Sequence, residues 1–171
     1  MNNKDMLKIK LVISLALLLN WMAIIYYLSS QVAKESTVHS QGLAISITSL
    51  IGIEISSESS LLFYEGIIRE TAHGIEFAIL SLFAYFSLKY LILLINKESL
   101  NKPWWVEKVV LVFSCIYALL DEVHQLFVPG RAFEIMDLAI DFAGIVVGIL
   151  ISKFIFCLSQ KNQCSNNEDF V

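Results

Sequence analysis

Charged side chains are scarce in this 171-residue chain, where Asp, Glu, Lys and Arg together make up 16% of the residues. Soluble domains carry roughly 25%. Hydrophobic residues reach 57%, and the mean hydropathy is +0.69. This composition is typical of membrane proteins. Since each membrane span uses about 20 residues, the length suits one domain of a few spans and leaves no room for a second.

Basic residues, cysteines and catalytic signatures are also sparse. A net charge of -4 excludes a basic nucleic-acid surface. The three cysteines are odd in number and form no CxxC, so they are interpreted as free thiols. There is no HExxH, nucleophile elbow, Walker loop or glycine-rich dinucleotide turn, so soluble metabolic enzyme classes have no support. No metal site is predicted, and the sequence leaves any cofactor unknown.

Four apolar runs dominate what is present. They cover Leu11–Leu28, Thr71–Ile95, Trp104–Leu120 and Ile135–Leu158. We therefore predict an all-α, polytopic membrane protein with four transmembrane helices. The first run is interpreted as a retained anchor, because it is longer than a signal-peptide core and "SSQVAKES" is a poor cleavage site. Residues 1–160 are expected to form the membrane domain and 161–171 a short polar cytoplasmic tail.

Two further patterns give orientation and packing. Nine of the 12 basic residues lie in the N-terminal tail, between Lys89 and Lys108, or near the C-terminal end. The positive-inside rule then makes both termini and the middle loop cytoplasmic, and turns segments 29–70 and 121–135 outward. Gly144 and Gly148 form a small-xxx-small pair, which allows close approach of two helices.

The first outward segment contains "STVHSQGLAISITSLIG", with apolar residues near helical spacing. Ser36 and Thr37 are candidate caps for this helix. Two interpretations stay open, namely an amphipathic helix on the outer leaflet or a helix packed over the bundle. His39 has no partner at a telling spacing and is read as a surface residue.

Polar residues gather where this topology brings three helix ends together. Arg69, His73 and Glu76 are spaced i, i+4, i+7 and share one helical face. The stretch "DEVHQLFVPGRAFEIMDLAID", residues 121–141, ends the third run and begins the fourth. Its "VPGR" predicts a type II turn that directs Arg131 back towards the bilayer. Ionisable groups at membrane depth cost roughly 2.5–3.5 kcal/mol each unless they face one another, water or the bundle interior.

Two readings of this polar cluster remain open on the residues alone. The groups could neutralise one another and merely join the helices. Alternatively, they form a site for a polar or anionic group, since a guanidinium binds phosphate or carboxylate through paired hydrogen bonds. His73 beside Glu76, or His124 beside Glu122, also offers a base or nucleophile, and zinc or manganese ligation is conceivable, but neither spacing is diagnostic.

The sequence "DEVHQLFVPGR" followed by "MDLAIDFAGIVVG" resembles the VanZ-like family of bacterial integral membrane proteins. "YYLSSQ" is similar to that family's end of the first span, and "IIRETAHGIEFAIL" to its opening of the second. The resemblance implies four spans in the bacterial cytoplasmic membrane and an association with teicoplanin resistance. The residues give no support to the phosphotransbutyrylase activity with which the family is also labelled. Its motif residues fall on Arg69, His73, Glu76, Asp121, Glu122, His124, Gln125, Arg131 and Asp137.

Two positions depart from the family pattern. Asp141 stands where the pattern has Asn, which adds a negative charge, and Phe77 replaces the more usual Tyr, which removes a hydroxyl. Both changes bear on whether this chain handles the same ligand as the founding member.

The leading hypothesis is a protein that binds or modifies an envelope component at the outer leaflet, either a lipid headgroup or a peptidoglycan precursor. The catalytic candidates are His73, His124, Glu122 and Asp137. The ligand-binding candidates are Arg69, Glu76, Asp121, Gln125, Arg131 and Asp141. A non-catalytic interaction protein, whose cluster only locks the helices, is the rival. A small transporter is disfavoured without internal repeats. Membrane lipids are the expected partners, nucleic acid is not, and self-association is left open.

Overall fold

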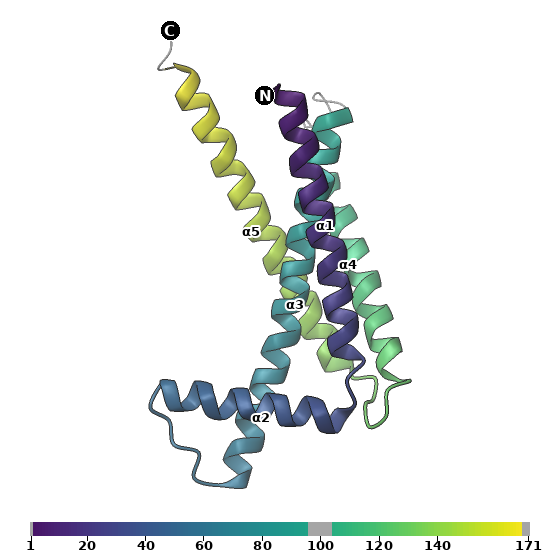
Figure 1. Ribbon diagram of the computed structural model, residues 1–171, viewed down its shortest axis with the longest axis vertical. Coiled ribbons are helices and arrows are strands. Elements are labelled where there is room, and N and C mark those ends of the chain that lie inside the picture. Colours follow the sequence, from purple (N-terminus) through teal and green to yellow (C-terminus); the bar gives the residue numbers. More distant parts are fainter. Residues whose placement is uncertain (1, 96–103, 169–171) are drawn as a thin grey trace.

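The computed structural model describes residues 2–95 and 104–168, which form five α-helices. They are α1 (Asn3–Ser29), α2 (Ala33–Leu50), α3 (Glu58–Ile95), α4 (Trp104–Gln125) and α5 (Ile135–Glu168). The four helices α1, α3, α4 and α5 run along the long axis and alternate in direction, whereas α2 lies across one end of the bundle (Figure 1). The predicted all-α fold is confirmed.

Three of these helices are long and apolar enough to cross a membrane: α1, α3 and the segment Ile135–Ser159 of α5. The chain is thus a polytopic membrane protein. The remaining long helix, α4, has 22 residues, which corresponds to about 33 Å at about 1.5 Å per residue and matches a hydrocarbon core of roughly 30 Å. It is less apolar because Glu107 and Lys108 lie near its beginning, and Asp121 and Glu122 near its end.

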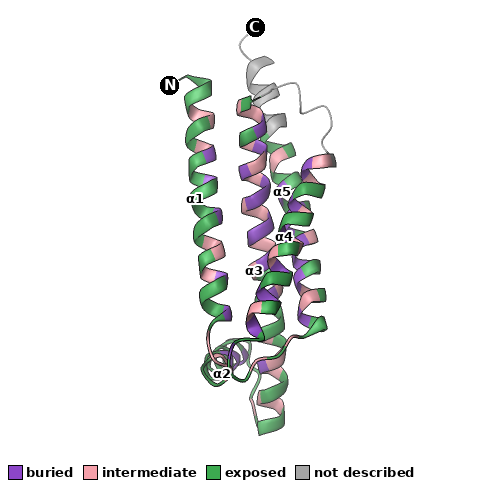
Figure 2. Ribbon diagram, turned by 90° about the vertical axis from the view of Figure 1, so that its right-hand side faces the viewer, coloured by how far each residue is buried: buried purple, intermediate pink, exposed green. Residues whose placement is uncertain are grey.

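The centre of the bundle is α3, which packs against α1, α2, α4 and α5. Its buried face carries Phe77, Leu80 and Tyr85, all within 1% of complete burial (Figure 2). α3 begins 13 residues before the predicted start at Thr71. Glu65, Arg69 and Glu70 lower the hydropathy of this extra segment. The apolar run in the sequence therefore starts after the helix does.

The predicted close approach of Gly144 and Gly148 is confirmed, and the partner is α3. A Cβ atom on Gly144 would overlap the carbonyl oxygen of Gly74, and one on Gly148 would overlap the carbonyl oxygen of Ala78. The Ser81 hydroxyl of α3 also donates to the Ile145 carbonyl of α5 at 3.2 Å. The backbones of α3 and α5 therefore touch because the glycines leave space.

α2 packs on α3 through a face of small residues, since Ser40, Ala44 and Thr48 are buried. The Gln41 side chain donates to Glu65 of α3 at 3.0 Å. Large apolar residues of α2 point outward instead; they include Val38, Leu43, Ile47 and Leu50. The predicted helix exists, and it packs over the bundle, as one of the two readings required. Its exposed apolar face keeps the other reading, a helix on the outer leaflet, as a prediction.

The start of α2 differs from the expectation. Val32 is the N-cap residue and makes no side-chain cap, so the prediction that Ser36 or Thr37 caps the helix was wrong. Both residues lie inside the helix, in its first turns. The chain is held here from outside, because the Ala33 N–H donates to the Pro129 carbonyl at 3.3 Å. A tertiary contact thereby replaces the local cap.

The two ends of the bundle differ in charge. One end of the bundle is formed by the start of α1, the end of α3 and the start of α4, and α5 runs towards the same end while diverging from them (Figure 1). This end carries Lys4, Lys8, Lys10, Lys89, Lys108 and Lys153. The opposite end holds α2, the turn between α4 and α5, and both arginines of the chain. We call the first the lysine end and the second the arginine end. The α5 helix continues to Glu168, past the predicted start of the tail at 161.

Candidate functional site

The turn between α4 and α5 has the conformation that "VPGR" predicted. Gly130 has φ of +82°, and the Arg131 N–H donates to the Val128 carbonyl at 3.1 Å. A positive φ at the third residue and this hydrogen bond define a type II turn. A Cβ atom on Gly130 would also lie 3.0 Å from the Cβ of Ala33. Glycine therefore suits both the turn and the contact with α2.

Arg131 ties this turn to the end of α1. Its Nε donates to the Gln31 carbonyl at 3.1 Å, and an Nη donates to the Leu28 carbonyl at 3.5 Å. The Leu28 carbonyl lies in the last turn of α1 and also accepts from the Gln31 N–H at 3.2 Å, whereas Gln31 follows the helix. A cation at this C-terminal end is favoured by the helix dipole. Burial lowers the pKa of the Arg131 guanidinium, and the Asp121 carboxylate opposes this shift. Arg131 thus uses part of its hydrogen-bonding capacity within the fold.

Asp121 joins α1 to α4 from beneath the turn. Its Oδ2 accepts a hydrogen bond from the Ser29 hydroxyl at 2.8 Å and from the Gln125 side-chain amide at 3.2 Å. All three side chains belong to buried residues. Hydrogen bonds to a carboxylate are stronger than neutral ones, so Asp121 holds the ends of α1 and α4 together.

Glu122 of α4 contacts the N-terminal end of α5. Its side chain is completely buried, and Oε2 accepts from the backbone N–H of Glu134, directly before α5 begins. A negative charge at a helix N-terminus is favourable because the helix dipole and its free N–H groups point there. The other oxygen, Oε1, is buried without a hydrogen-bond partner among the described residues.

Two adjoining cavities open at the arginine end. The turn cavity, of about 110 Å³, lies between α2, α3 and the turn, and its polar lining includes Gln125, Glu134 and Asp137. The α2 cavity, of about 200 Å³, lies between α1, α2 and α3, and its lining includes Gln31, His39 and Glu76. Ser36, Arg69, His73 and Arg131 line both. The two cavities therefore share two guanidinium groups and an imidazole.

Arg69, His73 and Glu76 reach the cavities from one face of α3, as their spacing predicted. Arg69 is exposed and makes no hydrogen bond or ion pair with any residue that the structure describes. Its donors are free to bind a ligand, in contrast with those of Arg131. A planar guanidinium presents up to five N–H donors and prefers carboxylate or phosphate oxygens.

His73 lies between the cavities and a buried carboxylate. Its Nδ1 is 3.9 Å from Oδ1 of Asp141, which has no exposed surface. Within the described part of the chain, neither Nδ1 nor either Asp141 oxygen has a hydrogen-bond partner. Buried polar atoms without partners are costly, so this pair is a source of instability as well as a candidate acid–base pair.

We expect Asp141→Asn to raise the free energy of unfolding by about 1 kcal/mol, because it removes a buried carboxylate from beside Asp121, Glu122 and Asp137. Thermal unfolding in detergent measures the change. Asp137→Asn, at a carboxylate that lines the turn cavity, is the control and should have a smaller effect. A loss of stability in Asp141→Asn would show instead that the carboxylate is held as an ion pair with His73.

His124 lies away from both cavities. Its Nε2 is 3.1 Å from the Ser30 hydroxyl, and its ring lies against Tyr26 with centroids 4.7 Å apart. Both partners come from the end of α1, where Tyr26 is exposed. The structure thus brings His73 together with Arg69 and Arg131, while His124 forms a separate contact between α4 and α1.

The described residues contain no group of three or more His, Cys, Asp or Glu side chains arranged to hold a metal ion. The cavity linings carry charges of both signs, because Glu76, Glu134 and Asp137 accompany the two arginines. Two guanidiniums and an imidazole line a space that is smaller than a typical ligand pocket of roughly 300–1,000 Å³.

The chain matches a known protein family. A family model described as VanZ/LLP1 matches residues 14–156, which is most of the chain. The chain belongs to the VanZ/LLP1 family. No curated protein and no solved structure matches it. The matched residues include α1 from its middle, the two cavities and the glycine contact between α3 and α5, so the VanZ/LLP1 region contains the whole candidate site.

Some residues of this VanZ/LLP1 domain that shape the site were not singled out in the sequence. Ser29, Ser30 and Gln31 contact Asp121, His124 and Arg131, respectively. Trp21 and Tyr117 donate to the carbonyls of Glu76 and Met22, at 2.9 Å and 2.7 Å. The "SSQ" of "YYLSSQ" was the available signal for the first three. Nothing in the spacing indicated the other two.

Proposed function

We propose that the arginine end binds the anionic group of a cell-envelope component, a lipid headgroup or a peptidoglycan precursor, and thereby influences susceptibility to teicoplanin-type glycopeptides. The observation that carries this proposal is Arg69, which lines both cavities without a partner among the described side chains. Arg131 and His73 add a second cation and a hydrogen-bond donor. Membership of the VanZ/LLP1 family supports the link to glycopeptides.

The site divides into groups that are used within the fold and groups that face the cavities. Asp121, Glu122 and part of Arg131 make hydrogen bonds inside the protein. Arg69, Glu76 and Asp137 line the cavities. In this proposal the first set holds the helices and the second contacts the ligand. Binding requires no chemical step, and His73 beside Asp141 is the pair to which a reaction would be assigned.

The proposal is tested by Arg69→Ala in a teicoplanin-sensitive bacterium that expresses the tagged protein. We expect the variant to lose the shift in minimum inhibitory concentration that the wild type causes, since one charged hydrogen-bonding partner contributes about 1.5–3 kcal/mol, or roughly 10- to 150-fold in affinity. Immunoblotting should show an unchanged protein level, because Arg69 is exposed.

Lys34→Ala is the matched control, since it removes an exposed cation from the same end but outside both cavities. It should retain the wild-type shift. If Arg69→Ala retained it at normal protein level, the anion-binding proposal would be wrong.

A second candidate function is a non-catalytic interaction protein whose polar cluster only locks the helices. The hydrogen bonds of Asp121, Glu122 and Arg131 favour it, because all of them lie within the fold. We call Asp121, Glu122 and Arg131 the locking residues. Under this alternative, alanine substitutions at the cavity residues and at the locking residues should both change the inhibitory concentration only by lowering the protein level. Plotting the inhibitory concentration against the protein level for both sets separates the two functions.

We further propose that α4 is a fourth crossing and that both termini face the cytoplasm of a bacterial cell. Support comes from the length of α4 and from the separation of lysines and arginines between the ends. A phosphatase fused after Glu58 should be active, and one fused at the C-terminus inactive. The reversed pattern would move the arginine end to the cytoplasm and remove the outer-leaflet reading.

A further inference from the structure

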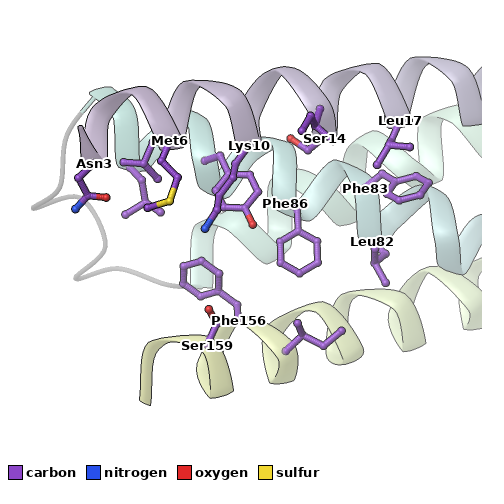
Figure 3. Close-up of a pocket in the computed structure, with 15 residues that line it drawn as sticks. Asn3, Met6, Lys10, Ser14, Leu17, Leu82, Phe83, Phe86, Phe156 and Ser159 are labelled. Carbon is purple, nitrogen blue, oxygen red and sulfur yellow. The ribbon is translucent and has the colours of Figure 1, made fainter. Parts of the chain in front are cut away.

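A third cavity, the Lys10 groove, lies at the opposite end from the candidate site. Its volume is about 480 Å³, and it runs between α1 and α5 with α3 as its floor (Figure 3). Both flanking helices pack on α3, and α5 diverges from α1 towards the lysine end (Figure 1). The groove is therefore open to whatever surrounds the helices.

The lining of the Lys10 groove mixes polar residues with Met6 and Leu7 at its outer end, and it is apolar apart from Ser14 at its inner end. Asn3, Lys10 and Ser159 lie towards the helix ends, while Leu17, Leu82 and Phe83 lie towards the middle of the bundle (Figure 3). From Asn3 to Leu17 the α1 helix rises by about 21 Å at about 1.5 Å per residue. A molecule with a polar head and one long apolar chain matches this pattern.

The charge of the groove determines whether it favours an anionic or a cationic headgroup. Among the lining residues that the structure describes, Lys10 is the one with a charged side chain. Its ammonium lies 5.9 Å from the centre of the Tyr90 ring and makes no ion pair with the residues described. Lys8, which is outside the groove, is already paired with Asp5 at 3.6 Å. Lys10 thus contacts an aromatic ring and pairs with no carboxylate of the described residues.

We propose that the Lys10 groove binds an anionic phospholipid, with one acyl chain along Leu17, Leu82 and Phe83 and the headgroup phosphate at Lys10. This occupant is inferred from the apolar, membrane-length helices, from the apolar inner end of the groove and from Lys10, the one charged side chain among its described lining residues. This site is separate from the arginine end and does not depend on the ligand proposed there. In the orientation given above, the lipid comes from the inner leaflet.

The proposal predicts which lipid the purified full-length protein retains. Native mass spectrometry from detergent, with phosphatidylglycerol and phosphatidylcholine of equal chain length, should show one retained molecule with preference for phosphatidylglycerol. Lys10→Gln should reduce that preference roughly fivefold, the effect of one cation near an anionic headgroup. Lys8→Gln is the matched control and should leave the preference unchanged.

A second variant tests the acyl chain. Leu17 is 43% exposed and lies beside Phe83 in the groove (Figure 3). The Leu17→Trp variant can therefore fold, and the indole ring should fill the groove. Retention of both lipids should fall, with helix content by circular dichroism unchanged.

Three outcomes would overturn the lipid site. The first is equal retention of both lipids by the wild type. The second is an equal effect of Lys8→Gln and Lys10→Gln, which would indicate surface charge alone. The third is a change of oligomeric state in Leu17→Trp with lipid retention intact, which would assign the groove to a second copy of the chain.

Discussion

Replacing Gly144 with alanine is expected to lower the free energy of unfolding by about 3 kcal/mol, although alanine normally stabilises a helix relative to glycine. The added Cβ would overlap the Gly74 carbonyl, which belongs to the backbone of α3 and cannot rotate away. The two helices must separate, and the Ser81 hydrogen bond to Ile145 is strained with them. Gly148→Ala should act similarly through Ala78. Unfolding in detergent and the yield of monodisperse protein measure both effects.

Two other helical glycines supply matched controls for this prediction. A Cβ on Gly42 of α2 or Gly66 of α3 would meet nothing within 4 Å. Alanine at either position should stabilise the protein by about 0.5–1 kcal/mol, because it reduces the conformational freedom of the unfolded chain. Equal behaviour of Gly144→Ala and Gly66→Ala would contradict the close packing of α3 on α5.

Asp121→Ala is the second substitution with a large expected effect. It leaves the Ser29 hydroxyl and the Gln125 amide buried without their acceptor. Each lost partner costs about 1–3 kcal/mol, so we expect a total loss of about 3 kcal/mol. Removing one negative charge from beside Glu122 and Asp141 offsets part of this cost. The loss should appear as a lower unfolding temperature and less protein in the membrane.

Asp121→Asn and Glu70→Ala are the control variants for Asp121→Ala. Asn keeps one acceptor oxygen for Ser29 or Gln125, so it should cost less than Ala. Glu70 is an exposed carboxylate of α3, and its removal should change stability by less than about 0.5 kcal/mol. A stable Asp121→Ala protein that had lost only its effect on glycopeptides would move Asp121 from the locking set to the ligand-binding set.

The contacts of the locking residues explain why their variants should lose stability, whereas variants of the cavity residue Arg69 should lose ligand binding. Glu122 accepts from a backbone N–H directly before α5, and Arg131 donates to a carbonyl in the last turn of α1. Asp121 accepts from two buried side chains at the ends of α1 and α4. Arg69 contacts no such group among the described residues and is exposed. A stability measurement should therefore report the first set, and a ligand or phenotype measurement the second.

A second ionic cluster, at the lysine end, was not identified from the sequence. Lys89 is 3% exposed, and its ammonium lies over the rings of Phe156 and Tyr85, at 5.1 Å and 5.5 Å. Glu107 of α4 pairs with Lys153 of α5 at 3.4 Å. From the sequence, Lys89 is counted only among the cytoplasmic cations. Tyr85 precedes it by four residues on α3, but the Phe156 ring comes from α5, and spacing along α3 cannot indicate it.

The sequence by itself determined the features that depend on local chemistry. Apolar runs of sufficient length predicted the long helices, since a lipid-exposed backbone must satisfy its hydrogen bonds internally. Pro129 and Gly130 determined the turn, and Gly144 with Gly148 determined that a helix would approach closely. The i, i+4, i+7 spacing brought Arg69, His73 and Glu76 to one face. Each of these depends on residues close together in the chain.

Only the tertiary structure decided which polar groups contact one another. Ser29 and Asp121 are 92 positions apart, and Gln31 and Arg131 are 100 apart. No local periodicity relates residues so far apart. The relative rotation and depth of α1, α3 and α4 determine that Arg131 is partly used by α1 while Arg69 is not. Helix packing thereby distinguishes two arginines that look equivalent in the sequence: both line the cavities, but only Arg131 also donates to the carbonyls of Leu28 and Gln31.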